Sequence, residues 1–173
     1  MAKVTHKELI KRLEQGLIKG LKLGFLDIGE ALYLIKENQT FKNKEGQNSF
    51  NEFCLTTKDP LPGNSPASRK IMAHRLIKIY ELLLKQAKIS KEDLIRLGHN
   101  KCYEIALNLR CIKNKRELKL VLKKFSKLNT HEIRKLFKGS SGAILDIAQK
   151  KTVITYYDSK GRKINVTENS VDL

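Results

Sequence analysis

The sequence predicts a mainly α-helical domain that contains successive helix-turn-helix units and ends in a β-hairpin. Three observations support this fold class. Leu and Ile recur at helical spacing through most of the chain, and Ser or Thr residues stand where helix N-caps are expected. A strand-turn-strand pattern occurs only near the C-terminus. Because aromatic residues make up 6% of the chain and Trp is absent, the core must be built mainly from Leu and Ile, which suits packed helices.

The first region, residues 1–48, is expected to form a long N-terminal helix. Thr5 and Glu8 form a capping-box signature, and the helical pattern continues to about Glu37. Three glycines occur at intervals of four residues, and each costs about 1 kcal/mol relative to Ala in a helix. We therefore expect a bend or break near Gly24, with glycines that allow close helix approach, and we consider this region a candidate dimerisation element.

The second region, residues 49–138, is expected to be a DNA-binding domain of three helix-turn-helix pairs. The first pair begins at a capping-box signature on Ser49. After a Pro-rich connector, Ser65 and Pro66 open a helix that extends to about Gln86. The other expected helices run from the Ser90 cap to Leu97, from Lys101 to Leu109, from Arg116 to Phe125 and from Thr130 to Lys138.

The third region, residues 143–173, is predicted to hold a short helix over 143–149 and a β-hairpin. The two strands are expected over 152–157 and 162–167, about a turn that places Gly161 where a positive φ is needed. Two strands alone are only marginally stable in water. The hairpin would therefore pack on the body, pair with another subunit or lie against a ligand.

The chain is strongly basic, and its charge is unevenly distributed. It carries 35 Lys and Arg against 18 Asp and Glu, a formal net charge of +17. Residues 113–138 hold ten Lys or Arg against two Glu (+8), residues 65–88 hold six against one (+5), and residues 25–64 hold four against six (−2). Such an excess attracts polyanions, which include nucleic acid, an anionic membrane or an acidic protein.

Several classes of protein are disfavoured by what the sequence lacks. No run of about 18 apolar residues and no signal-peptide pattern occurs, which predicts a cytoplasmic protein without a membrane partner. Cys54, Cys102 and Cys111 lack paired spacing and are expected to be buried, reduced thiols rather than metal ligands. No nucleotide-binding, metalloprotease or nucleophile-elbow motif is present. We therefore predict no enzymatic activity, no cofactor and no small-molecule substrate.

Two of the basic segments contain a turn and a capped helix, the geometry by which a helix N-terminus approaches phosphate and the major groove. In the first segment the candidate DNA-binding residues are Ser68, Arg69, Lys70, His74 and Lys78. Arg69 and Lys70 lie in the first turn and are expected to reach base edges or phosphate. Lys78 lies two turns further on and would be limited to phosphate.

The second basic segment supplies further candidates. They are Lys127, Thr130, His131, Arg134, Lys135 and Lys138, which leave Ile133, Leu136 and Phe137 to pack inward. Lys101 begins the second helix of the middle pair, which we expect to be more structural than DNA-reading. An alternative interpretation is that a Lys-rich composition simply places lysine on every exposed face.

Part of the chain resembles a known family. The stretch Ser49-Phe-x-x-Phe53, the helix Ala73 to Tyr80 and the segment Leu94 to Ile105 resemble phage- and plasmid-borne helix-turn-helix proteins, as in the central domain of ParB-type partition proteins. The resemblance covers about 90 of the 173 residues and implies binding to an operator or a centromere-like site. The chain departs from that family in its Pro-rich connector, and it lacks the ParB nucleotide-binding segment with its arginine-rich motif.

Together these features predict a sequence-specific binder of double-stranded DNA, acting as a plasmid- or phage-type regulator or partition-site binder. We expect a homodimer that places basic helices in successive major grooves. The alternative is a helical scaffold or RNA-binding interaction protein, in which Tyr156 and Tyr157 of the hairpin could stack on bases.

Overall fold

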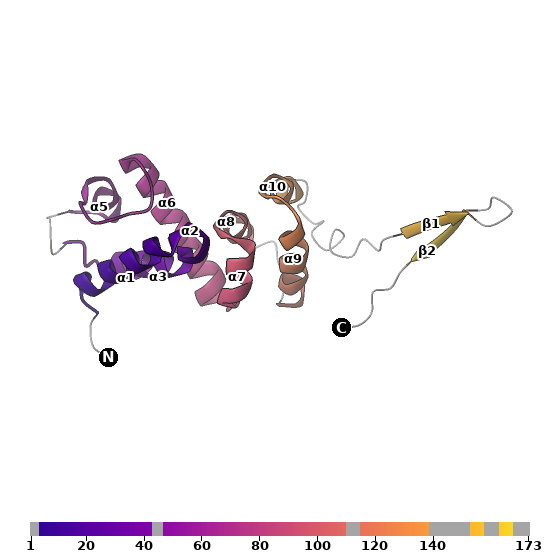
Figure 1. Cartoon of the computed structure of the whole chain (residues 1–173), viewed down its shortest axis with the longest axis horizontal. Helices are drawn as coiled ribbons and strands as arrows, with labels where there is room; N and C mark the ends of the chain where they lie inside the picture. Colours follow the sequence, from indigo (N-terminus) through magenta and orange to yellow (C-terminus); the bar gives the residue numbers. More distant parts are fainter. Residues whose placement is uncertain (1–3, 43–46, 110–114, 139–152, 158–162, 168–173) are drawn as a thin grey trace.

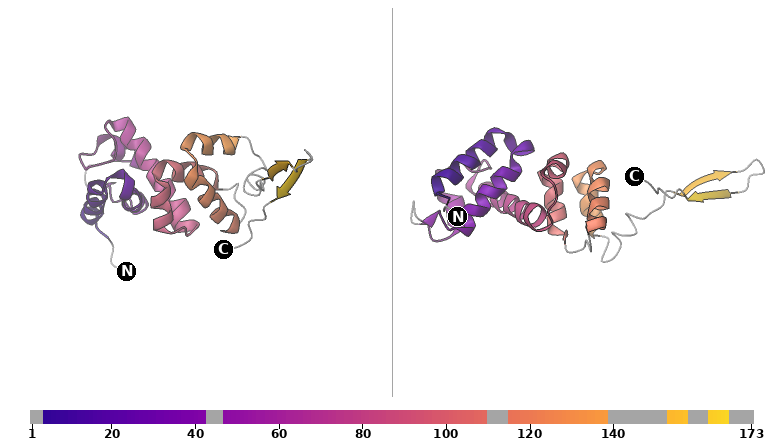
Figure 2. Two further views of the ribbon diagram at one scale, coloured as in Figure 1. Left: turned by 45° about the vertical axis from the view of Figure 1, so that its right-hand side comes forward. Right: turned by 90° about the horizontal axis from the view of Figure 1, so that it is seen from below.

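The computed structural model describes residues 4–42, 47–109, 115–138, 153–157 and 163–167, with side chains described over 4–42, 47–109 and 118–137. This part of the chain is mainly helical, as predicted. The elements are α1 (His6–Ile18), α2 (Gly20–Leu23), α3 (Phe25–Glu37), α5 (Phe50–Thr56), α6 (Pro66–Ile79), the π-helix η1 (Tyr80–Gln86), α7 (Lys91–Leu97), α8 (His99–Leu107), α9 (Lys115–Lys127), α10 (Thr130–Lys138), β1 (Val153–Tyr157) and β2 (Lys163–Thr167). Helices α1, α3, α5 and α6 gather at one end of the long axis, and α7 with α8 lies between α6 and the α9–α10 pair (Figures 1 and 2).

The long N-terminal helix predicted for residues 5–37 is not continuous, which corrects the sequence-based expectation. The chain breaks at Lys19 and again at Gly24, so that α1 packs against α3. The break near Gly24 was expected, and it brings the backbone of Gly24 close to that of Gly16. A Cβ atom on Gly24 would lie 1.9 Å from the carbonyl oxygen of Gly16, so a residue larger than glycine cannot occupy this position without a backbone shift. The region therefore contributes two longer helices, α1 and α3, joined by the short helix α2, instead of one extended helix.

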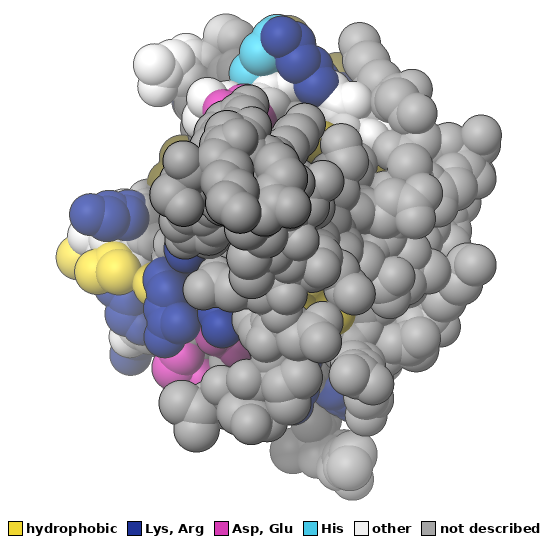
Figure 3. Space-filling view, turned by 90° about the vertical axis from the view of Figure 1, so that its right-hand side faces the viewer, with side chains coloured by type: hydrophobic (Ala, Val, Ile, Leu, Met, Phe, Trp, Pro, Cys, Tyr) yellow, Lys and Arg dark blue, Asp and Glu magenta, His cyan; other side chains and the backbone are white. Residues whose placement is uncertain are grey.

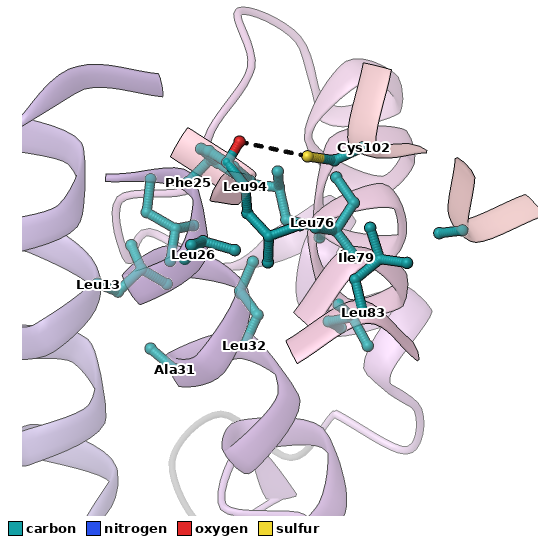
Figure 4. Packing of buried hydrophobic residues seen from close by; sticks show 14 of the residues in the cluster. Leu13, Phe25, Leu26, Ala31, Leu32, Leu76, Ile79, Leu83, Leu94 and Cys102 are labelled. Carbon is teal, nitrogen blue, oxygen red and sulfur yellow. Dashed lines mark hydrogen bonds between the residues drawn. The ribbon is translucent and has the colours of Figure 1, made fainter. Parts of the chain in front are cut away.

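The core is built mainly from Leu and Ile, as the composition predicts. Leu32 of α3, Leu76 of α6, Leu83 of η1 and Leu94 of α7 are fully buried and converge in Figure 4. The thiol of Cys102 on α8 donates a 3.4 Å hydrogen bond to the carbonyl oxygen of Leu94. The core thus runs without interruption from the first helices to α8 and fixes α6 between α3 and α8.

The caps of the first helix pair form where the sequence predicts them. Ser49 accepts a hydrogen bond from the backbone N–H of Glu52 at the start of α5, and Ser65 accepts one from Ser68 at the start of α6. Pro66 occupies the first turn of α6, as expected. The predicted helix to Gln86 is present, but its last seven residues form the π-helix η1.

The other two helix pairs also form, with one shifted boundary. Ser90 caps α7 as predicted, and α7 ends at Gly98, whose φ is 79°. Because α8 starts directly after this glycine, at His99, the helix begins before the predicted start at Lys101, and Lys101 lies within it. Helix α7 contacts α9 and α8 contacts α10, so the last pair packs on the middle one.

The C-terminal strands β1 and β2 pair in an antiparallel arrangement, with Val153 opposite Thr167 and Tyr157 opposite Lys163. The turn with Gly161 and the short helix predicted over 143–149 lie outside the described residues.

Candidate nucleic-acid interface

Helix α6 has a buried face and, opposite it, a face that is exposed to solvent. Its inner side places Ala73, Leu76 and Ile79 in the core. On the opposite side, Ile71 leaves 55% of its surface exposed, and Arg75 follows it one turn later. Since α6 contacts α3, α5 and α8, this exposed face is held rigidly and is bordered by residues of neighbouring helices.

A hollow of about 470 Å³ lies along the exposed face of α6, and we call it the α6 hollow. Its lining residues come from α6, from η1, from the end of α3 and from α8. They are Lys36, Lys70, Ile71, His74, Arg75, Ile77, Lys78, Glu81 and Tyr103. Four of these side chains are cationic and one is acidic. Among the residues that the structure describes, none of the four cations forms an ion pair within 4 Å of a carboxylate. The hollow therefore concentrates positive charge that is available to an anionic ligand.

Arg75 is the best-positioned cation of the α6 hollow, and the sequence analysis did not select it. Its guanidinium carbon lies 5.0 Å from the centre of the Tyr103 ring on α8, within the distance of a cation–π contact. The candidates predicted from the sequence form the row from Lys70 through His74 to Lys78, and Arg75 belongs to the adjacent row of the helix. The i, i+4 relation of Arg75 to Ile71, opposite the apolar stripe of α6, was the signal that could have identified it.

His74 lies in the α6 hollow, but it serves first to join α5 to α6. Its Nε2 forms a 2.7 Å hydrogen bond with the side-chain oxygen of Asn51, and its ring packs edge-on against Phe50 at 5.7 Å between centres. Partial burial lowers the pKa of His74, and the charges of Lys36 and Lys70 lower it further. Both effects favour the neutral form of the ring, so His74 contributes less positive charge to the hollow than an ordinary histidine would.

Two of the predicted contact residues shape the start of α6 instead of projecting from it. The Ser68 hydroxyl accepts a 2.9 Å hydrogen bond from the Ser65 backbone N–H and donates one of 2.9 Å to the Ser65 carbonyl oxygen. Arg69 is half-buried, and its Nε donates to the Gly63 carbonyl oxygen at 3.5 Å. Gly63 has a φ of 125°, and a Cβ there would lie 2.7 Å from the Arg69 backbone nitrogen. The connector is thus held against the start of α6 by the contacts of Ser68, Arg69 and Gly63.

Two predicted contact residues of the later helices form bonds within the fold. The Lys101 ammonium donates to the carbonyl oxygens of Phe125 (3.2 Å) and Ser126 (3.0 Å), near the end of α9. Arg134 on α10 donates through Nε (3.1 Å) and Nη2 to the buried carboxylate of Glu104 on α8. The hydrogen bond to Glu104, and then its charge, raise the pKa of Arg134. Lys101 and Arg134 therefore fasten the α9–α10 pair to α8.

The other candidates of the second basic segment lie on the surface. Lys127, His131 and Lys135 are exposed, Thr130 is half-buried at the start of α10, and the side chain of Lys138 lies outside the described residues. Ile133 is buried, as expected from the helical spacing, and Phe137 packs edge-on against Phe125. None of these residues lines the α6 hollow.

Cys54 and Cys102 are buried, as predicted, and burial raises the pKa of each thiol to about 12. Cys111 lies outside the described residues. In the part of the chain that the structure describes, no group of three or more His, Cys, Asp or Glu residues is placed to hold a metal ion. Nor does that part contain a helix with the length and apolar character needed to span a membrane.

Comparisons with family models, with curated proteins and with solved structures found no match to this chain. The chemistry of its surface therefore carries the functional argument.

Proposed function

We propose that this protein binds double-stranded DNA in a sequence-specific manner, as a regulator or partition-site binder, by placing α6 in the major groove. The observation that supports the proposal most directly is the α6 hollow. Its four cations surround the exposed face of a helix that is capped at its N-terminus and packed on three neighbouring helices. A major groove about 12 Å wide admits one α-helix, so such a helix can bring its exposed face to base edges.

The side chains of the α6 hollow suit different parts of a duplex. The Arg75 guanidinium offers a planar pair of donors, which matches the two acceptors on the major-groove edge of guanine. Lys36, Lys70 and Lys78 carry compact charges on flexible stems, which suit phosphate oxygens. We therefore assign base contact to Arg75 and phosphate contact to the three lysines. Arg75 takes the role that the sequence analysis gave to Arg69.

The hollow suits a duplex better than a single strand. Proteins that recognise single-stranded RNA usually stack bases on exposed aromatic rings. The aromatic residue that lines the α6 hollow is Tyr103, and the Arg75 side chain lies over its ring. An extended single strand would have to displace this contact, whereas a groove-bound helix would leave it in place.

The test begins with selection of bound sites from a pool of random duplexes. Affinity for the selected duplex is then measured by fluorescence anisotropy against an unrelated duplex and a single-stranded RNA of equal length, at one salt concentration. We expect Arg75→Ala to lower affinity for the selected duplex by roughly 10- to 100-fold, since a base-contacting arginine contributes about 1–3 kcal/mol. The matched control is Arg12→Ala, which removes an exposed arginine from α1. Equal affinities of the two variants, or stronger competition by the RNA, would refute the proposal.

A further inference from the structure

Helix α9 exposes a straight row of lysines. Lys119, Lys123 and Lys127 are all exposed, and they follow one another at i, i+4 and i+8. The opposite side of the helix buries Leu118 and Val121 against the body. With a rise of 1.5 Å per residue, successive lysines stand about 6 Å apart along the helix axis. Within the described residues, no carboxylate forms an ion pair with any of these three side chains.

The row borders a second hollow, of about 390 Å³, between α7 and α9. Arg96 faces Lys119 and Lys123 across it, and 73% of the Arg96 side chain is exposed. Asp93 also lines this hollow: its Oδ2 accepts a 2.8 Å hydrogen bond from Ser90 as part of the α7 cap, and its Oδ1 lies 3.7 Å from Nη1 of Arg96, so this carboxylate partly balances the charge of Arg96. We call the three lysines and Arg96 the α7–α9 surface. Figure 3 shows Lys and Arg side chains grouped along one edge of this end of the molecule, beside a smaller acidic group.

The α7–α9 surface is separate from the α6 hollow, yet it is fixed relative to it. Helices α7 and α8 lie between α6 and α9 (Figures 1 and 2). Lys101 of α8 holds the end of α9 through two carbonyl oxygens, and Arg134 of α10 binds Glu104 of α8. The same helix α8 supplies Tyr103 to the α6 hollow. These contacts connect the α7–α9 surface to the α6 hollow through α8.

We propose that the α7–α9 surface binds the sugar-phosphate backbone of the duplex that α6 reads, independently of base sequence. The phosphates of a duplex form a regular line of negative charge along each strand, and lysines about 6 Å apart along α9 can each reach a different phosphate. Lysine ammonium groups suit this role because they bind phosphate as point charges. This inference rests on the proposed function and extends it, since it adds a contact that contributes affinity without specificity.

The test compares two triple variants that remove the same charge. K119A/K123A/K127A removes the α9 row, and K7A/K11A/K22A removes three exposed lysines from α1 and α2. For each protein, the slope of log K against log salt concentration is measured on the selected and on an unrelated duplex. We expect the α9 variant to lose roughly 2–3 units of slope on both duplexes, about 0.9 per phosphate contact, and to keep its preference for the selected site. The control variant should lose less than about one unit.

The outcomes separate this inference from the proposed function. An unchanged slope in the α9 variant, or equal losses in the two triple variants, would overturn the inference. If Arg75→Ala still abolished the preference for the selected site, the proposed function would stand alone. If instead Arg75→Ala had no effect while the α9 variant lost its slope, the α7–α9 surface would stand and the assignment of α6 would fail. A wild-type protein that bound no duplex would overturn both.

Discussion

The two basic segments of this chain differ in how the fold uses their charge. Residues 113–138 carry the larger net charge, +8 against +5 for residues 65–88. Yet the smaller charge is the more concentrated in space. Three cations of α6 join Lys36 of α3 around one hollow, whereas in the other segment Arg134 is paired with Glu104, and Lys119 and Lys123 are the two cations that line the hollow between α7 and α9. Charge density along a sequence therefore does not predict where charge converges in the fold.

The physical reason for the difference is the number of neighbours that each helix has. Helix α6 contacts α3, α5 and α8, so residues of other helices border its exposed face. The charges around this face also act on two histidines: burial first, and then Lys36 of α3 and Lys70 of α6, lower the pKa of His74, and burial and then Arg75 of α6 lower that of His99 on α8. Helix α10 contacts mainly α8 and keeps most of its polar side in water.

The largest effect should come from a comparison of two double variants, one in each basic region. K70A/R75A and K127A/K135A each remove two cations, the first from the α6 hollow and the second from α9 and α10. We expect the first variant to lose affinity for the selected duplex by about 100-fold, because a base contact and a phosphate contact disappear together. The second should lose less than about 10-fold, equally on every duplex. Equal losses in anisotropy titrations at one salt concentration would contradict the distinction between the regions.

A substitution in the connector tests whether the start of α6 must be held in place. Gly63→Ala should destabilise the protein by about 1–3 kcal/mol, because the backbone has a positive φ and the new methyl group meets the Arg69 nitrogen. Urea unfolding measures the change. The control is Gly20→Ala, which has a positive φ but no atom within 4 Å of the added Cβ. A cost no larger than that of the control would show that the packing of the connector on α6 is not important.

Local features of the site were predictable from the sequence, because they depend on neighbouring residues. The caps at Ser49, Ser65 and Ser90 form as expected, since a capping side chain bonds to a backbone N–H only three residues away. The buried positions of α6 follow in the same way from its helical period.

Contacts between distant parts of the chain were not predictable, and they decide the roles of the charged residues. Arg134 meets Glu104 thirty residues earlier, and Lys101 meets the end of α9 twenty-four residues later. Arg75 gains importance only because α8 brings Tyr103 beside it. The spacing of residues within one helix does not indicate such a partner. The sequence therefore identified the basic residues, but it did not distinguish those that bond to other parts of the protein from those that face solvent.

Arg134 and Lys135 are adjacent on α10, and substituting each in turn tests whether the ion pair with Glu104 determines the role of Arg134. Arg134→Ala should lower thermal stability and leave duplex binding largely unchanged, because the buried Glu104 carboxylate loses its partner. Lys135→Ala should do the reverse, with unchanged stability and a loss of about one unit of salt slope on every duplex. Thermal unfolding and anisotropy on the same two proteins give both readouts. A drop in affinity for Arg134→Ala without a change in stability would place its guanidinium on DNA instead of on Glu104.

The smallest expected effect is a loss of stability at acid pH that arises from His74 and His99. Burial and neighbouring cations lower the pKa of both His74 and His99 from an ordinary value of 6.5. The unfolded chain therefore binds more protons than the folded one as the pH falls below about 6.5, so stability is greatest above that pH and decreases on the acid side. We expect H74Q/H99Q to flatten this decrease in thermal unfolding between about pH 7.5 and 5. His131→Gln, on the exposed surface of α10, is the control and should preserve it. Parallel acid destabilisation of the wild type and the double variant would locate its source elsewhere in the protein.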